Sequence, residues 1–360
     1  MDKNKRSTLK SIAERVGVSI TTVSRVLGGK ARRYRISKDT EEAVFRAAEE
    51  LHYAPNHLAR GLRLKRTHTI GLIIPDISNP FFASIARSVV MEARKVGYSI
   101  MLCDTQDNIR LEVDSIQLLQ SRKVDGLIIC PVGQDGRHLE RLYDSGEAMV
   151  LVDRYFPQSK CPSVTSDNYK GAVQAVTHFI ENGHRVIACI QGLLNTSTNN
   201  DRVRGYRDAH KMHGIPVDES LIVGDSFGER NGYIGAKLLL NRTSRPTAIF
   251  ACSNLISLGA FRAVSEEGLK IPDDISIISF DDQPYSDYLS TPMTTVSQPN
   301  IEMGHIAFKL LIDQIELNTR PETNCVILPT KLIRRQSVKK LVPRSHIHEE
   351  NGQIEKGKNV

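Results

Sequence analysis

The apolar positions of this chain follow different periods in two parts of the sequence. From Thr69 onward, short apolar runs of strand length alternate with longer segments of mixed polarity. The runs span 70–75, 98–103, 126–130, 149–153, 186–191, 248–253 and 275–281, and the segments between them span 80–96, 109–122, 168–182, 199–213, 228–241 and 254–268. Alternating strands and helices form parallel sheets flanked by helices. Because these runs are too many for one compact sheet, an α/β fold with two lobes is predicted.

Residues 8–27 show the period of a helix instead. Apolar residues form two stripes at helical spacing, which are Leu9, Ile12 and Ala13, then Val23, Val26 and Leu27. Gly17 lies between the stripes, where a tight turn favours a residue that tolerates positive φ. Ser19 is placed to cap the second helix. The pattern predicts an all-α helix-turn-helix head, in which Ile20, Thr21, Thr22 and Arg25 project from the first turns of the second helix.

A third helix is expected after a basic loop at 28–36. Ser37 is a suitable N-cap for it, and an acidic first turn follows. Its apolar face would consist of Val44, Phe45, Ala48 and Leu51. This face would close a three-helix core, and Pro55 would end the unit.

Basic residues are concentrated at this end of the chain. Residues 1–66 hold 16 lysines and arginines against 7 aspartates and glutamates, whereas the remaining residues hold 32 against 34. A positive head on a nearly neutral body is the electrostatic pattern of a phosphate-binding protein. A membrane surface would also attract positive charge, but the head lacks the large apolar face of an interfacial helix. Double-stranded DNA is therefore the expected partner.

A short basic amphipathic stretch, residues 56–66, follows the head. It is too short to be a stable helix alone, and Gly61 weakens it by about 1 kcal/mol relative to alanine. We expect it to fold only when a partner holds it. Leu62 would be exposed on such a helix, which suits a wedge between base pairs.

Several classes of protein are disfavoured. No apolar stretch reaches the roughly 18 residues of a transmembrane helix, and no signal peptide opens the sequence. The cysteines are scattered and lie mostly in apolar runs, so reduced, packed thiols are expected at Cys103, Cys130, Cys161, Cys189, Cys252 and Cys325. There is no metal-ligand spacing, phosphate loop or nucleophile elbow. We expect a cytoplasmic protein without metal or cofactor that is not an enzyme.

Specific motifs recur in order along the chain. They are VSITTVSRVL at 18–27, YAPNHLARGL at 53–62, GLIIPDISNPFF at 71–82, VDGLI at 124–128, DR at 153–154, RVRGY at 202–206 and IPDDISIISFDD at 271–282. Together they resemble the lactose-repressor (LacI) family of bacterial transcription regulators, from about Thr8 to Arg335. The resemblance implies a head, a hinge helix, and a periplasmic-binding-protein-like α/β core of two lobes that also dimerises.

The implied domain boundaries follow from this resemblance. The head would span 1–55, the hinge helix and linker 56–66, and the effector-binding core 67–337. Within the core, the first lobe would hold about 67–166 and 296–320, and the second about 167–295 and 321–337. The polar residues 338–360 are expected to form a disordered tail.

The resemblance also assigns DNA-binding roles to individual residues. Ile20, Thr21 and Arg25 would lie in the major groove, and Ser19 and Thr22 would reach phosphates or base edges. Arginine suits a bidentate contact with guanine, and the methyl groups of isoleucine and threonine suit thymine. The loop at 29–37 is longer than in most members and resembles the subgroup that includes the fructose repressor. Phosphate or hinge contacts are expected from Lys30, Arg32, Arg33, Tyr34, Arg35, Asn56, Ala59, Arg60 and Leu62.

The effector site is expected between the lobes, where ligands bind at the carboxyl ends of strands. The positions that match ribose-binding-protein relatives are Asn79, Phe81, Phe82, Asp153, Arg154, Arg202, Phe227, Asn254, Asp281 and Gln298. Carboxylates, amides and arginines bind adjacent hydroxyls, while phenylalanines stack on C–H faces. One of Phe81 and Phe82 is expected in the core. Leu255 departs from the relatives, which usually carry aspartate after the asparagine.

These observations predict a homodimeric repressor that a small sugar or sugar phosphate releases from its operator, with assembly into a tetramer left open. Ligand closure of the lobes would separate the hinge helices. One alternative is a corepressor-type regulator, in which a purine-like ligand strengthens DNA binding. Another is a sugar-binding transport protein, against which the basic head and the missing signal peptide both argue.

Overall fold

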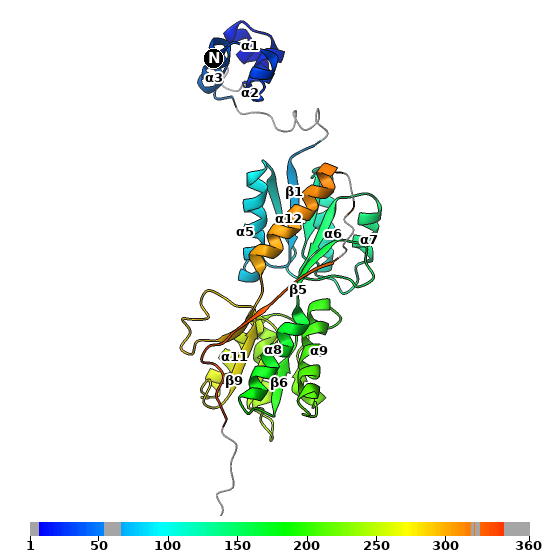
Figure 1. The fold of residues 1–360 in the computed structure, drawn as a ribbon, viewed down its shortest axis with the longest axis vertical. Helices are drawn as coiled ribbons and strands as arrows, with labels where there is room; N and C mark the ends of the chain where they lie inside the picture. Colours follow the sequence, from blue (N-terminus) through cyan, green and yellow to red (C-terminus); the bar gives the residue numbers. More distant parts are fainter. Residues whose placement is uncertain (1–6, 54–65, 318–319, 321–324, 342–360) are drawn as a thin grey trace, which may run out of the picture. The chain divides into compact units, whose positions relative to one another are not determined.

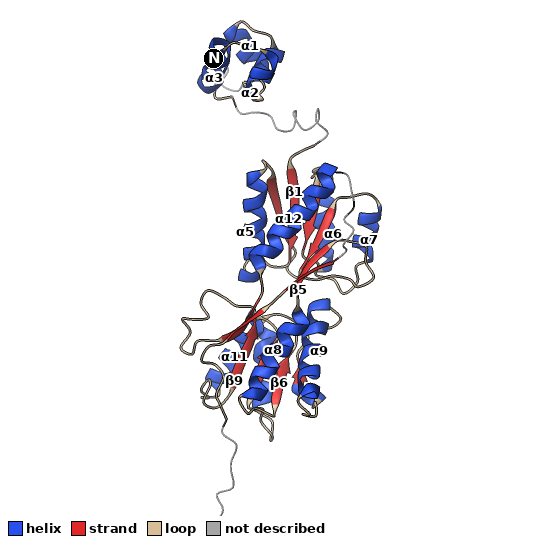
Figure 2. Ribbon diagram, in the orientation of Figure 1, coloured by secondary structure: helices blue, strands red, loops and turns tan. Residues whose placement is uncertain are grey.

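The computed structural model describes residues 7–53, 66–317, 320 and 325–341. The chain forms two compact units, residues 1–67 and residues 68–360, which we describe separately. Figure 1 shows the course of the chain, and Figure 2 shows its helices and strands. Residues 56–65 of the expected hinge and linker lie outside the described residues.

The first unit is a helical head with its own small core. Its elements are α1 (Leu9–Val16), α2 (Ile20–Leu27), the 3₁₀ turn η1 (Arg32–Tyr34) and α3 (Lys38–Glu50). Gly17 adopts a φ of 74° at the end of α1, as the turn between the helices requires. Hydroxyl side chains cap all three helices, those of Thr8, Ser19 and Ser37.

The apolar face expected for the third helix is only partly correct. Val44 and Ala47 are buried in the head core, together with residues of α1 and α2 such as Ile12 and Val23. Phe45, which was expected in that core, is instead half exposed. The residue lies next to Val44 on the helix, and a rotation of about 100° per residue turns its side chain away from α1 and α2.

The second unit contains two lobes, each built on a six-stranded sheet. The strands of the first sheet are β1 (Thr69–Ile74), β2 (Ser99–Asp104), β3 (Gly126–Ile129), β4 (Met149–Val152), β5 (Ser163–Ser166) and β11 (Cys325–Leu328). They are all parallel and lie in the order β11-β5-β4-β3-β1-β2. The helices of this lobe are α5 (Pro80–Lys95), α6 (Ile109–Ser121), α7 (Arg137–Asp144) and α12 (Asn300–Leu317).

Alternation along β1 decides which helices cover which face of the first sheet. Ile70 and Leu72 pack with α5 and α12 on one face, whereas Ile73 packs with α6 and α7 on the other. Figure 1 shows this layered arrangement around β1. Burial on both faces explains why the strands read as continuous apolar runs.

The second sheet repeats the strand order of the first. Its strands are β6 (Ile187–Ile190), β7 (Ile222–Val223), β8 (Ala248–Ala251), β9 (Ser276–Phe280), β10 (Thr294–Ser297) and β12 (Lys331–Ile333). They lie in the order β12-β10-β9-β8-β6-β7, and only β12 is antiparallel to its neighbour. The surrounding elements are α8 (Asn168–Glu181), α9 (Ser197–Met212), η2 (Glu219–Leu221), α10 (Glu229–Leu240) and α11 (Asn254–Glu266).

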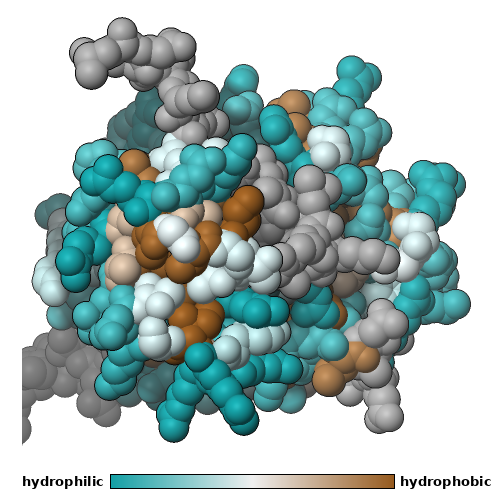
Figure 3. Space-filling view, turned by 90° about the horizontal axis from the view of Figure 1, so that it is seen from above, coloured by the Kyte–Doolittle hydropathy of each residue, from teal (hydrophilic) through white to brown (hydrophobic). Residues whose placement is uncertain are grey.

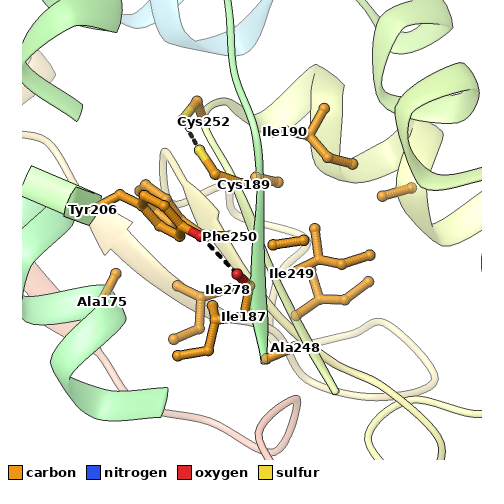
Figure 4. Close-up of a cluster of buried hydrophobic side chains, with 14 of the residues drawn as sticks. Ala175, Ile187, Cys189, Ile190, Tyr206, Ala248, Ile249, Phe250, Cys252 and Ile278 are labelled. Carbon is orange, nitrogen blue, oxygen red and sulfur yellow. Dashed lines mark hydrogen bonds between the residues drawn. The ribbon is translucent and has the colours of Figure 1, made fainter. Parts of the chain in front are cut away.

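The core of the second lobe consists of buried apolar side chains, some of which are drawn in Figure 4. Tyr206 is fully buried and its hydroxyl donates to the Ile187 carbonyl at 2.7 Å, so its one polar group is satisfied. The thiols of Cys189 and Cys252 lie 3.6 Å apart in this core. Both cysteines are fully buried among apolar side chains.

Over the described residues the chain crosses between the lobes three times, after β5, after β10 and after β11. The expected lobe boundaries need correction. Residues 325–328 form β11 beside β5 in the first lobe, and residues 296–297 complete β10 in the second. Residues 325–333 read as one short apolar run with a Pro-Thr interruption, so the sequence does not reveal that the run divides between two sheets.

The expected disordered tail also begins too early. Lys339 N donates to Ser276 Oγ at 2.9 Å, and Leu341 N donates to the Asn182 carbonyl at 2.8 Å. Residues 338–341 therefore lie against the second lobe, because their backbone groups pair with it. Within the described residues, none of the helices combines the length and apolar character needed to cross a membrane.

Candidate DNA-binding helix and effector site

Helix α2 presents short polar and apolar side chains at its first turn. Ser19 Oγ accepts from Thr22 N at 3.0 Å and lies 2.8 Å from Thr22 Oγ1, so the two hydroxyls brace the start of the helix. Ile20 and Thr21 are exposed, with 48% of Ile20 accessible. An exposed isoleucine at a helix start has no core to pack against, and it is available to a thymine methyl group.

The basic loop after α2 carries four exposed cationic side chains, those of Lys30, Arg32, Arg33 and Arg35. It is not irregular throughout, because η1 forms within it. Tyr34 lies on this turn, and the guanidinium carbon of Arg25 sits 3.8 Å from the centre of its ring. The loop thus carries exposed positive charge and places an aromatic ring against Arg25 of α2. The hinge residues Asn56, Ala59, Arg60 and Leu62 lie outside the described residues.

Two aspartates occupy equivalent places in the two lobes. Asp153 directly follows β4 and Asp281 directly follows β9. These strands are third in their sheets when the strands are counted from the edges formed by β11 and β12. Each has a φ of 72°, and the N–H of each donates at 2.9 Å to a carbonyl of the next strand. Both side chains are buried. The positions at strand ends match the rule that ligands bind at the carboxyl edge of a parallel sheet.

The two carboxylates share an electrostatic environment. Burial raises the pKa of Asp153 to about 6, opposed by the charges of Arg154 and Arg202 and reinforced by Asp281. Burial also raises the pKa of Asp281, opposed by Arg202 and by hydrogen bonds from Gln298 and the Asn254 backbone. Asp153 belongs to the first lobe and Arg202 to the second, so charges from both lobes meet here.

Both arginines are held in fixed positions. Arg154 Nη1 donates to the carbonyls of Pro131 and Val132 at 3.1 Å each, and its Nη2 lies 3.6 Å from Asp107. Arg202 donates through Nε to Asn168 Oδ1 at 2.8 Å and through Nη1 to the Cys252 carbonyl at 2.6 Å. Arg154 Nε is buried without a hydrogen-bond partner among the described residues, which leaves a donor for a ligand.

The aromatic residues divide between the site and the core. Phe81 and Phe82 both pack in the core of the first lobe, 4.9 Å apart and edge to face, whereas only one of them was expected there. Phe227 is half buried, and the guanidinium carbons of Arg154 and Arg202 lie 5.3 and 6.0 Å from its ring centre. Its ring therefore lies beside both cations.

Amide side chains connect the lobes at the same place. Asn79 caps α5 by accepting from Phe81 N at 3.1 Å, and its Oδ1 also accepts from Asn254 Nδ2 of the second lobe at 3.1 Å. Gln298, on the β10–α12 crossover, donates to Asp281, while its Oε1 is buried and unpartnered among the described residues. Asn254 and Gln298 thus both donate to Asp281, and Asn79 is connected to them through Asn254.

A cavity of about 610 Å³ lies beside this group, between α5 and the start of α12. Gln298 lines it, but none of the other nine predicted effector residues does. Among the described residues, no group of His, Cys, Asp or Glu side chains is placed to hold a metal ion.

Sequence reasoning missed several residues of the site. Asn168 binds Arg202 from the start of α8, and Phe280 lies under the same guanidinium at 3.7 Å. Tyr155 N of the first lobe donates to Ser197 Oγ of the second lobe at 3.0 Å. Phe280 lies in the motif at 271–282, whereas the contacts of Asn168 with Arg202 and of Tyr155 with Ser197 are seen only in the structure.

Comparison with known proteins accounts for both units. Residues 8–56 match the family model described as "Bacterial regulatory proteins, lacI family", and residues 176–338 match "Periplasmic binding protein-like domain". The chain is 34% identical over 340 residues to the HTH-type transcriptional regulator DegA of Bacillus subtilis, which covers 93% of this chain and 99% of DegA. It is 33% identical to the ribose operon repressor of Haemophilus influenzae, over 91% of this chain and 98% of that protein. The PurR repressor of Haemophilus influenzae is 32% identical, over 93% and 100%.

Solved structures agree with these sequence relatives. The lac repressor dimer bound to operator and the anti-inducer ONPF matches with a TM-score of 0.83 and 25% identity, covering 93% of this chain and 100% of that one. A transcriptional regulator from Enterococcus faecium with bound ribose matches with a TM-score of 0.68 and 27% identity, over 76% and 100%.

Proposed function

The chain belongs to the LacI family of bacterial regulatory proteins and is a DNA-binding transcriptional regulator, and from this premise we propose that a small sugar binds between its two lobes and releases a homodimer from operator DNA. The DNA would be read by α2, with Ile20, Thr21 and Arg25 at base edges. The loop after α2 would supply phosphate contacts.

The observation that carries the proposal is the meeting of Asp153, Arg154, Arg202 and Asp281 in one buried place. Buried carboxylates are costly unless a partner compensates them, and the raised pKa values of both aspartates express that cost. Sugar hydroxyls can donate to both carboxylates and accept from both guanidinium groups. The ring of Phe227 beside the arginines suits the C–H face of a sugar.

Charge favours an unphosphorylated sugar over a sugar phosphate. Two carboxylates face two guanidinium groups, and carbonyl oxygens already occupy Arg154 Nη1 and Arg202 Nη1. A phosphate placed here would meet the two buried aspartates, which repel it. The bound ribose in the Enterococcus faecium regulator supports the same ligand class.

Dimerisation is supported by the symmetry of operators and by the surface of the first lobe. Two heads are needed for a palindromic site, and the lac repressor structure is a dimer on its operator. In this chain α5 and the edge strand β2 expose Val90, Met91, Val96 and Leu102. The surface seen in Figure 3 is mostly hydrophilic, with hydrophobic side chains in separate areas. An apolar helix face beside an unpaired strand edge fits contact with a second copy.

The test combines DNA selection with a ligand panel. A duplex sequence is first selected from a random pool with the full-length protein, and its binding is then measured with and without pentoses, hexoses and their phosphates. Thermal shift on the same panel identifies the ligand, because one at a hundred times its Kd stabilises the protein by roughly 2.7 kcal/mol. We expect one neutral monosaccharide both to raise the melting temperature and to weaken DNA binding.

The other outcomes separate the alternatives. If no sugar acts but a purine base strengthens DNA binding, the protein is a corepressor-type regulator and the ligand assignment fails. If sugars bind and the affinity for DNA does not change in either direction, the proposed coupling between sugar binding and DNA release is refuted.

A further inference from the structure

We propose that Tyr34, on the long loop between α2 and α3, positions Arg25 for reading a base and so contributes to the sequence preference of the head. The proposal rests on the DNA-binding function above and on the assignment of Arg25 to a base edge. It makes Tyr34 a positioning residue that acts through the arginine.

The loop returns to the helix that precedes it. Gly29, with a φ of 68°, reverses the chain after α2, and Lys30 N donates to the Arg25 carbonyl at 2.9 Å. Ala31 is only 2% exposed, and Ile36 packs against the head core. Both ends of the loop are therefore anchored, and the 3₁₀ turn between them carries Tyr34.

The contact between the two side chains is close. The guanidinium carbon of Arg25 lies 3.8 Å from the centre of the Tyr34 ring, a distance at which the planar cation stacks on the ring face. Within residues 7–53 no carboxylate is paired with Arg25, whereas Arg15 lies 3.1 Å from Glu50. The aromatic ring is thus the side-chain contact that orients the Arg25 guanidinium.

Stacking and base recognition use different parts of the guanidinium. The ring contacts the face of the cation, and the N–H groups in its plane stay available for the O6 and N7 atoms of guanine. A free arginine loses rotamer freedom when it binds, while a stacked one has already lost part of it. The ring should therefore improve binding only where Arg25 reads a base, unlike a phosphate contact, which acts on every sequence equally.

The experiment measures Kd for the selected duplex and for each of its single-base-pair variants, at several salt concentrations, with full-length protein. Tyr34→Leu removes the ring, and Tyr34→Phe keeps the ring but removes the hydroxyl. Arg25→Ala identifies the base pair that the arginine reads. Arg33→Ala is the matched control, because it removes a charge from the same loop and leaves the ring in place.

We expect Tyr34→Leu to weaken binding to the selected site by about 2- to 30-fold, the range for loss of a cation–π contact. The loss of discrimination should fall on the base pair that Arg25→Ala identifies, with the salt dependence unchanged. Tyr34→Phe should behave as the unmodified protein. Arg33→Ala should weaken all sequences equally and reduce the salt slope by about 1.

Any one of several outcomes overturns the proposal. Tyr34→Leu could discriminate like the unmodified protein, it could weaken every sequence equally, or Tyr34→Phe could match it and so assign the effect to the hydroxyl. Circular dichroism checks folding, and loss of helix in Tyr34→Leu would make the ring a folding element instead. If the unmodified protein selects no sequence, the DNA-binding role assigned to α2 fails as well, which distinguishes that failure from this one.

Discussion

Replacing Asp153 by asparagine should stabilise the protein and remove its response to sugar. The side chain is buried, and burial raises its pKa from 3.8 to about 6. A carboxyl group with a raised pKa destabilises the folded state once it ionises, because the unfolded chain releases the proton more easily. Asparagine has nearly the same shape and carries no charge, so the substitution removes this destabilisation of the folded state.

The magnitude follows from the two pKa values. Well below pH 3.8 the Asp153 carboxyl group is protonated in both the folded and the unfolded state, so it does not change the free energy of unfolding. Its destabilising effect grows between pH 3.8 and 6 and is nearly constant above pH 6. At about 1.4 kcal/mol per pKa unit, Asp153→Asn should be more stable by about 2 kcal/mol at pH 5 and about 3 kcal/mol at pH 7. In a unit that spans residues 68–360, the difference at pH 7 corresponds to a rise of roughly 5 °C in Tm.

Urea denaturation and thermal melting between pH 5 and 8, without sugar, provide the assay. Asp135→Asn is the matched control, because that exposed carboxylate has its pKa lowered by the backbone and side chain of Arg137, and its replacement should not stabilise. With the inducing sugar added, Asp153→Asn should show little further rise in Tm. Equal or lower stability of Asp153→Asn at pH 7, or an advantage that does not change with pH, would refute the reasoning.

Other substitutions test the remaining parts of the molecule. Asp281→Ala should bind the operator normally yet fail to release it with sugar, and normal release in a DNA-binding assay would contradict the site assignment. Phe250→Ala should cost about 3–5 kcal/mol in urea denaturation, because the side chain is fully buried in the second lobe. Ser19→Ala removes the oxygen that accepts from Thr22 N and should destabilise the head by about 1 kcal/mol, measured by hydrogen exchange of its amides. Leu62→Ala should weaken operator binding and reduce DNA bending in a gel-shift assay without changing core stability.

The strands that the sequence reveals are those buried through apolar side chains. All seven predicted runs contain strands of the structure, whereas β5, β7, β10, β11 and β12 were missed. Of these five, β5 and β10 lie inside the sheets and not at an edge. Their sequences, Ser-Val-Thr-Ser and Thr-Thr-Val-Ser, are rich in hydroxyls, and their serines and threonines are mostly buried. Thr165 Oγ1 donates to the Asp153 carbonyl at 2.7 Å, which satisfies the buried hydroxyl. A pattern based on polarity does not identify such strands.

Residues of the candidate site were predictable where they end a strand or match a position of ribose-binding-protein relatives, as Gln298 does, and not where their only signal is a contact in the folded chain. Asp153 and Asp281 follow apolar runs, so the sheet rule locates them. Asn79 was expected to contact a ligand, and this role stays a prediction; its oxygen accepts in the cap of α5 and from Asn254. Asn168 begins a helix and gives no signal in the sequence. Its contact with Arg202 depends on how α8 and α9 pack.

The return of the chain to the first lobe has a consequence for synthesis. The first sheet lacks β11 until residue 328 is made, and the second lacks β12 until residue 333. The head is complete in sequence by residue 53 and has its own core. At about 5–20 residues per second, the 275 residues between positions 53 and 328 take roughly 14–55 seconds to translate. During that interval a nascent chain carries a basic head that is complete in sequence on a body in which neither sheet is complete.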